Sequence, residues 1–484
     1  MDSKYITYIG VDDVEIDLFE SQYVVPEGMC YDSYLVKGDR IAVMDTVDAR
    51  MAGEWMARLS AALGGRKPDY LVLQHMEPDH SGAVMAFLNE YPDTTIVCSQ
   101  QAANFLLQFN ETLRAEIRPL TAPAAEAARE CCCGNNGVPA TGTAKECCCG
   151  NNGIPAEVTA KEHCCGNNGV HSTETTKELC CGDQGTPAAG TAGLRAEIRT
   201  VKEGDCLELG EGAELQFIAA PMVHWPEVMM TWFAAEKTLF SADGFGKFGV
   251  YDADPDDWAC EARRYYFNIC GKYGAQVAKV LQKAAGLDIQ RICPLHGPVL
   301  TGDRLAEAVR LYTVWSSYKP ETPEGILIAY ASIHGNTAAA ARRLANILEA
   351  KGAPKVAVTD LCRDDVAEAV EDAFRMGTMV LACSTYDGGI FPPMKCFLDK
   401  LAMKGFCDRR VALVENGTWA PLAAKLMRAS LESMKSIDIL DRTLTIKSSM
   451  KESQVPELEA LADLLLTPSS KAPGSDWKSV RGPP

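Results

Sequence analysis

The feature that most constrains this 484-residue chain is an alternation of short β-type runs with amphipathic helical patterns, found in both halves. In the first half several runs lead into loops that carry His or Asp: DYLVLQH, LQFIAAPMVHWPE, KTLFSADGFG and IQRICPLHGPVL. Functional residues gather at such strand ends, because the sheet fixes them while the loop exposes them. The pattern predicts an α/β fold with a site built from several strand ends.

A second domain is expected after the Pro-containing connection SSYKPETPEG. It begins with the buried-type strand GILIAYAS and continues as five strands alternating with five helices. That order predicts a parallel, doubly wound sheet. We therefore expect a first domain over 1–320, a second over 325–466 and a disordered tail over 467–484.

The charge of the chain limits its partners. With 65 acidic and 47 basic residues the net charge is −18, which argues against nucleic acid and against an anionic membrane surface. No apolar run reaches the roughly 20 residues that span a bilayer. The N-terminus lacks a basic segment followed by an apolar one, so we expect a cytoplasmic protein.

Between the two β/α patterns of the first half lies an internal repeat with a period of 16 residues, which holds ten of the 20 cysteines. The hexapeptide LRAEIR flanks it, at 113–118 and again at 194–199. We interpret 119–193 as a tandem expansion inserted into a surface turn, since loops tolerate insertions at modest entropic cost. We expect only one LRAEIR copy to occupy the strand position and the repeat to be weakly packed. Two interpretations stay open for its CCxGNNG units: no function, or soft-metal or redox binding.

The segment HMEPDH supplies the first set of candidate ligands, His75, Glu77, Asp79 and His80. Three more candidates follow β-type runs downstream: His224, Asp243 and His296. Four imidazoles and three carboxylates are enough for two metal ions, and a carboxylate can bridge two cations. Imidazole with carboxylate suits iron, whose open positions permit O₂ or NO chemistry. A polar loop without metal would leave many partly buried acids without partners.

Three loops of the second domain form another candidate site. YASIHGNT (330–337) joins a strand to a helix and could wrap a phosphate, although it is neither a Walker A loop nor GxGxxG. CSTYDGGIFPP (383–393) and ENGTWAP (415–421) follow the next strands and combine an aromatic residue with small residues. Three such loops at one edge of a sheet suggest a flavin mononucleotide (FMN) site.

Taken in order, HMEPDH, HWPE, SADGFG, LHGP, SIHGNT and TYDGGIFPP resemble the flavodiiron proteins, or A-type flavoproteins. The resemblance implies a metallo-β-lactamase-like αββα sandwich domain followed by a flavodoxin-like doubly wound parallel sheet domain. It also implies that His75, Glu77 and His224 hold one iron, that Asp79 and His296 hold the other, and that Asp243 bridges them. His80 matches a position that is a ligand in some members of the family and not in others.

The same resemblance implies which residues hold FMN: Ser332, Ile333, His334, Gly335, Asn336, Thr337, Ser384, Thr385, Tyr386, Asp387, Gly388, Gly389 and Trp419. The chain departs from the family pattern at Cys383–Ser384, where Ser-Pro is expected, and at Asp387, where Asn is expected. These departures concern contacts to the flavin ring more than binding itself.

The activity implied by the resemblance is reduction of O₂ to water or of NO to N₂O. Electrons would enter at FMN from rubredoxin or a similar donor, in a head-to-tail homodimer or a dimer of dimers. No motif distinguishes the gases, and we expect O₂ or both. The alternatives are a zinc hydrolase fused to a flavodoxin, an electron carrier in which only the flavodoxin half works, and a thiol-rich metal-storage element on an enzyme scaffold. Glu77, where such hydrolases have a second His, favours iron.

Overall fold

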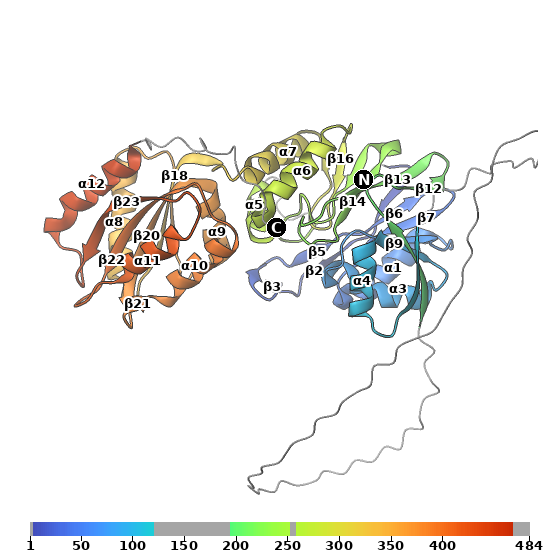
Figure 1. Ribbon diagram of the computed structural model, residues 1–484, viewed down its shortest axis with the longest axis horizontal. Coiled ribbons are helices and arrows are strands. Elements are labelled where there is room, and N and C mark those ends of the chain that lie inside the picture. Colours follow the sequence, from blue (N-terminus) through green and yellow to red (C-terminus); the bar gives the residue numbers. More distant parts are fainter. Residues whose placement is uncertain (1–2, 121–193, 252–257, 468–484) are drawn as a thin grey trace, which may run out of the picture. The chain divides into compact units, whose positions relative to one another are not determined.

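The computed structural model describes residues 3–120, 194–251 and 258–467 (Figure 1). The predicted tail except for Thr467, and the predicted insertion except for Pro119 and Leu120, lie outside the described residues. None of the described helices combines the length and the apolar character that crossing a membrane requires.

The first half of the chain forms two large β-sheets. One has seven strands in the order β1-β6-β7-β8-β9-β11-β10, and the other has six in the order β12-β13-β14-β15-β16-β17. The strands of the first are β1 (Ile6–Tyr8), β6 (Tyr34–Lys37), β7 (Ile41–Met44), β8 (Tyr70–Leu73), β9 (Thr95–Ser99), β10 (Arg114–Pro119) and β11 (Arg195–Val201). Those of the second are β12 (Cys206–Gly210), β13 (Ala213–Ala219), β14 (Met229–Phe233), β15 (Thr238–Phe240), β16 (Arg291–Cys293) and β17 (Leu300–Thr301).

Helices and two small strand pairs complete this half. The helices are α1 (Ala52–Leu63), α2 (Pro78–Ser81), α3 (Val84–Glu90), α4 (Gln100–Phe109), α5 (Trp258–Ile269), α6 (Gly274–Ala284) and α7 (Gly302–Ser316), with single 3₁₀ turns at Ala49–Met51, Ala234–Glu236 and Gly271–Tyr273. The pairs are β2 (Val11–Asp13) with β5 (Met29–Tyr31), and β3 (Leu18–Phe19) with β4 (Tyr23–Val24).

The two sheets pack face to face, and the alternation of side chains along each strand explains why. Successive residues of a strand point to opposite faces. In β8, Val72 joins an apolar cluster that includes Phe217 and Phe240 of the second sheet, whereas Leu71 and Leu73 join the cluster that holds the helix residues. With helices on the outer faces, this is the predicted αββα sandwich.

The two LRAEIR copies correct one of our expectations. Both copies form strands, and they pair in parallel with each residue opposite its own duplicate, from Arg114 opposite Arg195 to Arg118 opposite Arg199. The second copy, β11, also pairs with β9 inside the sheet, while the first, β10, is the outer strand. The expectation that only one copy has a strand position is therefore wrong, because the edge of β11 still offers unpaired backbone groups to a segment with the same alternation.

The second half forms a parallel five-stranded sheet in the order β19-β18-β20-β22-β23, as predicted. This is the flavodoxin-like order. Its strands are β18 (Thr322–Ala331), β19 (Val356–Asp360), β20 (Met376–Tyr386), β22 (Arg410–Asn416) and β23 (Asp438–Ile446), with β21 (Gly389–Ile390) paired to the end of β20. Its helices are α8 (Asn336–Ala350), α9 (Val366–Arg375), α10 (Pro392–Met403), α11 (Ala423–Glu432) and α12 (Val455–Leu466), and a 3₁₀ turn spans Glu452–Gln454.

Candidate metal and flavin sites

The predicted metal ligands come from four places in the sandwich. His75 and Glu77 follow β8, and the short helix α2, which begins with Pro78, carries Asp79 and His80. Proline suits this first helical position because its φ is already helical and its missing N–H has no partner to lose there. The remaining three follow β13, β15 and β16: His224, Asp243 and His296.

The structure brings all seven side chains together as two groups. His75, Glu77, His224 and Asp243 form one, and Asp79, His80 and His296 form the other. Within each group, the possible ligand atoms all lie within 4.8 Å of one another. His80 thus lies with the second group.

Asp243 faces both groups. Its Oδ2 lies 3.2 Å from Nε2 of His75 and 3.1 Å from Nε2 of His224, in the first group. Its Oδ1 lies 3.1 Å from Nε2 of His80 in the second. A carboxylate with one oxygen toward each group is arranged as a bridge between two cations.

The buried atoms at this centre fit metal ions better than hydrogen bonds. Both carboxylate oxygens of Asp79 and Asp243, and Nε2 of His80 and of His296, are buried and have no hydrogen-bond partner among the described residues. Burying such groups without hydrogen bonds is costly. Imidazole nitrogen with carboxylate oxygen is a donor set that suits iron.

The imidazoles and carboxylates at the centre shift one another's pKa values when no metal is bound, as His224 and Glu77 illustrate. Burial lowers the pKa of His224, but the nearby carboxylates of Asp243 and Glu77 outweigh burial and raise it to about 9. Burial raises the pKa of Glu77, but His224 and His75 outweigh it and lower it to about 2. The imidazoles and carboxylates therefore act as counter-ions for one another, a role that a bound metal cation takes over.

The predicted flavin loops meet at one edge of the parallel five-stranded sheet in the second half of the chain. Residues 332–337 follow β18, 384–389 lie at and after the end of β20, and Trp419 follows β22. These three strands are neighbours in the sheet. The direction in which successive strands are added to the sheet reverses between β18 and β20. Ligands of open α/β sheets bind at such a switch point, outside the carboxyl ends of the strands.

Hydrogen bonds connect these loops, and several of their residues remain exposed to solvent. The Gly335 amide donates to Oγ of Ser332 at 3.1 Å, in a turn where Gly335 has φ +86°. The buried hydroxyls of Thr337 and Ser384 lie 2.9 Å apart. Oγ1 of half-buried Thr385 instead accepts the backbone amides that begin α11. The exposed members of the predicted set are Ile333, His334, Gly335, Asn336, Tyr386, Asp387, Gly388 and Trp419, and Gly389 is half-buried.

The loops fit a flavin in two ways. The N-terminus of the 15-residue helix α8 presents backbone amides to an anion such as a phosphate. Trp419 is 90% exposed, so its ring packs against little of the described chain and is available to a flat ligand. The departure at Asp387 keeps the backbone intact, since Asp387 has φ 49° and both Asp and Asn tolerate this left-handed region.

Comparisons with known proteins agree with this geometry. Residues 192–297 match the family model described as ODP family beta lactamase. The structure is similar to the rubredoxin oxygen:oxidoreductase (ROO) of Desulfovibrio gigas, with a TM-score of 0.73 and 21% identity over 96% of both chains. It is also similar to the flavodiiron protein of Giardia intestinalis, with a TM-score of 0.74 and 19% identity over 95% of this chain and 94% of that one.

The chain has the flavodiiron fold. A curated relative, the anaerobic nitric oxide reductase flavorubredoxin of Vibrio vulnificus (strain YJ016), is 23% identical over 436 residues, which cover 88% of this chain and 71% of the relative. The predicted resemblance and the predicted fold class, a metallo-β-lactamase-like domain followed by a flavodoxin-like one, are confirmed.

The flavodiiron fold also places residues at the centre that the sequence did not point to. Oε1 of buried Glu227 lies 2.8 Å from Nδ1 of His75, and the backbone oxygen of Cys30 lies 2.7 Å from Nδ1 of His296. Glu227 is 152 residues from His75, so no spacing signals the pair. Its place beside His224 in HWPE was the one available clue. A backbone oxygen such as that of Cys30 leaves no signal at all.

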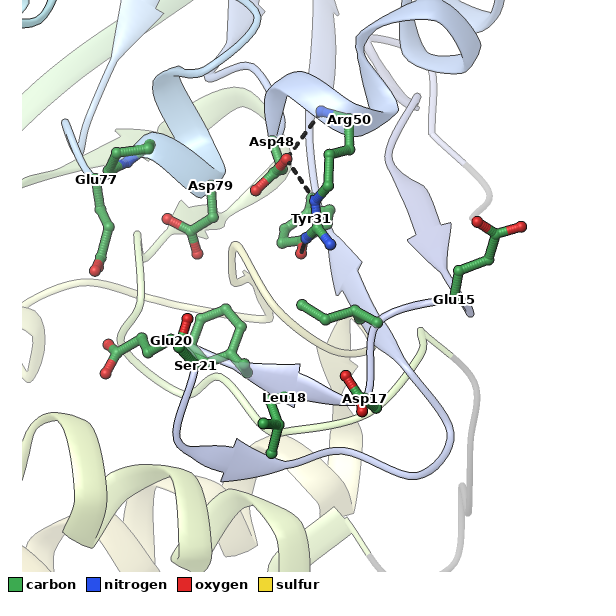
Figure 2. Close-up of a pocket in the computed structure, with 13 residues that line it drawn as sticks. Glu15, Asp17, Leu18, Glu20, Ser21, Tyr31, Asp48, Arg50, Glu77 and Asp79 are labelled. Atoms are coloured by element: carbon green, nitrogen blue, oxygen red, sulfur yellow. Dashed lines mark hydrogen bonds and ion pairs between the residues drawn. The ribbon is translucent and has the colours of Figure 1, made fainter. Parts of the chain in front are cut away.

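An acidic pocket of about 500 Å³ opens beside the centre (Figure 2). Glu77 and Asp79 lie at one side of it, and Glu20 faces them from the segment that joins β3 to β4. Arg50 bonds to Asp48 and, at 3.0 Å, to the hydroxyl of Tyr31. The pocket borders both groups of ligands, because Glu77 belongs to one and Asp79 to the other.

Proposed function

We propose that this chain reduces O₂ to water, NO to N₂O, or both, with electrons that pass from a rubredoxin-type donor through FMN to a diiron centre. The observation that carries the proposal is the position of Asp243, with one oxygen toward each of two adjacent ligand groups. The same chain carries a flavin-type loop set on a flavodoxin-like sheet. The names of the relatives, a nitric oxide reductase and an oxygen oxidoreductase, support this chemistry.

In this proposal the chain's own side chains hold the metal in two sets. His75, Glu77 and His224 would hold one iron, as the first ligand group suggests. Asp79, His80 and His296 would hold the other, and Asp243 would be shared. A diiron centre, when bound, supplies electrons and open coordination positions for a small gas molecule. The three carboxylates offset the positive charge of the metals, which lets the centre exist in a buried place.

The two reactions determine how many electrons and protons the protein must supply to the centre. Reduction of O₂ to two waters takes four electrons and four protons, and reduction of two NO to N₂O and one water takes two of each. The acidic pocket connects the centre to solvent and is lined by carboxylates, so its side chains can exchange protons near Glu77 and Asp79.

FMN, when bound, accepts and passes on electrons singly. The loop residues named above, Ser332 to Thr337 and Ser384 to Gly389 with Trp419, would hold it. Ser332, Thr337 and the α8 N-terminus lie where the phosphate would bind. Trp419 and Tyr386 are the exposed aromatic rings available to the flavin.

The domain division belongs to the same proposal. The diiron domain would cover 1–320, interrupted by the 119–193 insertion, the FMN domain 325–466, and the tail 467–484. The parallel five-stranded sheet and its helices support the division, because together they run from Thr322 to Leu466. The zinc hydrolase alternative is not favoured, because the relatives that match along most of the chain are named as reductases.

The decisive experiment is metal and flavin analysis of anaerobically purified protein, followed by O₂ and NO consumption with reduced rubredoxin. We expect two irons and one FMN per chain and turnover of at least one gas. Two zinc ions without iron, or FMN without any metal, would contradict the proposal. A steady-state rate with NO far above that with O₂ would overturn our expectation for O₂.

We also propose that the enzyme works as a head-to-tail homodimer, in which the FMN loops of one subunit approach the acidic pocket of the other. Exposed Ile333, Tyr386 and Trp419 around the flavin loops support an interface there. The test mixes two inactive variants, Asp243→Ala and a double Ser332→Ala, Thr337→Ala variant selected for loss of FMN. Activity that returns on co-expression supports the dimer, and a mixed dimer that stays inactive counts against it.

A further inference from the structure

Glu227 is a buried carboxylate that the proposed chemistry does not use directly. Its Oε1 accepts a hydrogen bond from the backbone amide of Met76 at 3.0 Å and lies 2.8 Å from Nδ1 of His75. Its own backbone oxygen accepts a hydrogen bond from Oγ of Ser99, at the end of β9. Glu227 is thus fixed by the loop after β8 and by β9, and it points at the outer nitrogen of His75.

The pair suits an imidazole that binds metal through Nε2. With a metal ion on Nε2, the proton of neutral His75 is on Nδ1, where the carboxylate of Glu227 can accept it in a hydrogen bond. Nε2 faces Asp243 at 3.2 Å and Glu77 at 3.3 Å, inside the first ligand group. An outer carboxylate of this kind orients a metal-bound imidazole and raises its basicity.

The second group is held differently. Nδ1 of His296 lies 2.7 Å from the backbone oxygen of Cys30, which is a neutral acceptor. The direct carboxylates are otherwise balanced, with Glu77 on one side, Asp79 on the other, and Asp243 between them. Glu227 places a carboxylate directly at the outer nitrogen of His75, whereas the outer nitrogen of His296 meets a neutral carbonyl. The buried carboxylates near the second group, Asp32 and Asp45, are hydrogen-bonded to Tyr8 and Gln74 instead.

We propose that Glu227 is a positioning residue that fixes His75 for metal binding and makes the two irons electronically unequal. This inference rests on the proposed function. An iron bound by His75, Glu77 and His224 would then have a lower reduction potential than an iron bound by Asp79, His80 and His296. An external one-electron reductant would therefore reduce the second iron first.

The test uses Glu227→Gln in the full-length protein, because glutamine keeps the length and the acceptor oxygen but removes the charge. Glu236→Gln is the matched control, since Glu236 likewise accepts from backbone amides, those of Lys4 and Tyr5, and its carboxylate pairs with Arg291. Iron content, chelator competition, a redox titration and ⁵⁷Fe Mössbauer spectra of the one-electron-reduced state are compared with those of the unmodified protein.

We expect Glu227→Gln to bind iron about 10- to 100-fold more weakly than the unmodified protein. The lower of its two iron potentials should shift upward while FMN binding stays unchanged, and Glu236→Gln should match the unmodified protein. Iron affinity and potentials equal to those of the unmodified protein in Glu227→Gln would overturn the proposal, because a purely structural role survives this substitution.

A second measurement applies if Glu227→Gln does not fold. In unmodified protein reconstituted with zinc and labelled with ¹⁵N-histidine, His75 should show a solvent-protected Nδ1–H proton at low field. Absence of that proton would overturn the positioning role. Zinc binding does not depend on the redox activity, so this readout separates failure of the Glu227 inference from failure of the proposed function.

Discussion

Oδ1 of Asp243 lies 3.1 Å from Nε2 of His80, and both side chains are buried. Family resemblance leaves His80 open, since its position is a ligand in some members and not in others. In this chain its ring joins Asp79 and His296, and neither of its ring nitrogens has a hydrogen-bond partner in the part of the chain that the structure describes. These contacts support our proposal that His80 is a ligand of the second iron.

Replacement of His80 tests this assignment. His80→Ala should lower the iron content from two toward one per chain, because the second group loses one of its two imidazoles. Metal analysis after desalting measures the effect, with His334→Ala as the control because His334 is exposed in a flavin loop. Two irons in His80→Ala would show that His80 is not required for metal binding.

The carboxylates of the first ligand group should matter more than His80 for iron binding and turnover. Glu77→His or Asp243→Ala should lose iron and abolish turnover while FMN stays bound, since the flavin loops belong to the other sheet. Iron content, flavin absorbance and gas consumption are measured on the same preparation. Unchanged iron and unchanged rates in both variants would refute the site assignment.

The metal-free protein should show a specific dependence on pH. The pKa of His224 is raised to about 9 in the folded state, above its usual 6.5. Its contribution to stability is therefore present below pH 6.5 and is lost as pH rises through 9, with a size of about 3 kcal/mol at most. Thermal unfolding of metal-free protein at pH 6 and pH 9.5 should show the loss. His224→Gln should make it smaller but not abolish it, because nearby carboxylates also raise the pKa values of buried His75 and His296. An equal melting temperature at both pH values would contradict this prediction.

Trp419 should contribute to flavin affinity and not to stability. Its side chain is exposed, so Trp419→Ala should change the free energy of unfolding by less than about 0.5 kcal/mol. Loss of an aromatic contact should weaken FMN binding about 3- to 10-fold. Equilibrium dialysis and denaturant unfolding measure the two effects separately. A large loss of stability with unchanged FMN affinity would show that the ring packs on protein.

The LRAEIR copies offer a matched pair of isoleucines. Ile198 in β11 is fully buried, whereas its duplicate Ile117 in β10 is half-buried. Ile198→Ala should lower the free energy of unfolding by about 2–4 kcal/mol, and Ile117→Ala should lower it by less than about 1 kcal/mol. Denaturant unfolding of the two variants measures both effects. Deletion of 113–193, which joins Thr112 to Leu194, should leave a folded protein that still binds iron and FMN. Similar costs for the two isoleucines, or loss of iron on deletion, would show that the outer strand is structural.

The sequence revealed the parts of the site that lie close together along the chain or at strand ends. His75 to His80 form one segment, and His224 and His296 each follow a β-type run, so their convergence could be expected. Glu227 could not be assigned, because its partner is set by how the loop after β8 meets the turn before β14. The pairing of β10 with β11 was missed because the hydrophobic pattern reports that a segment is a strand, not which neighbour it finds.

The duplicate pairing of β10 and β11 has a consequence for how this protein can change. Both ends of the segment between them are fixed at one sheet edge, each residue beside its own copy. Unequal recombination or replication slippage can therefore add or remove whole 16-residue units while the two anchor strands keep their register. The number of 16-residue units can therefore vary between generations without changing the strands that position His224 and Asp243. Selection can act on the length and thiol content of the segment without altering the gas-reducing chemistry.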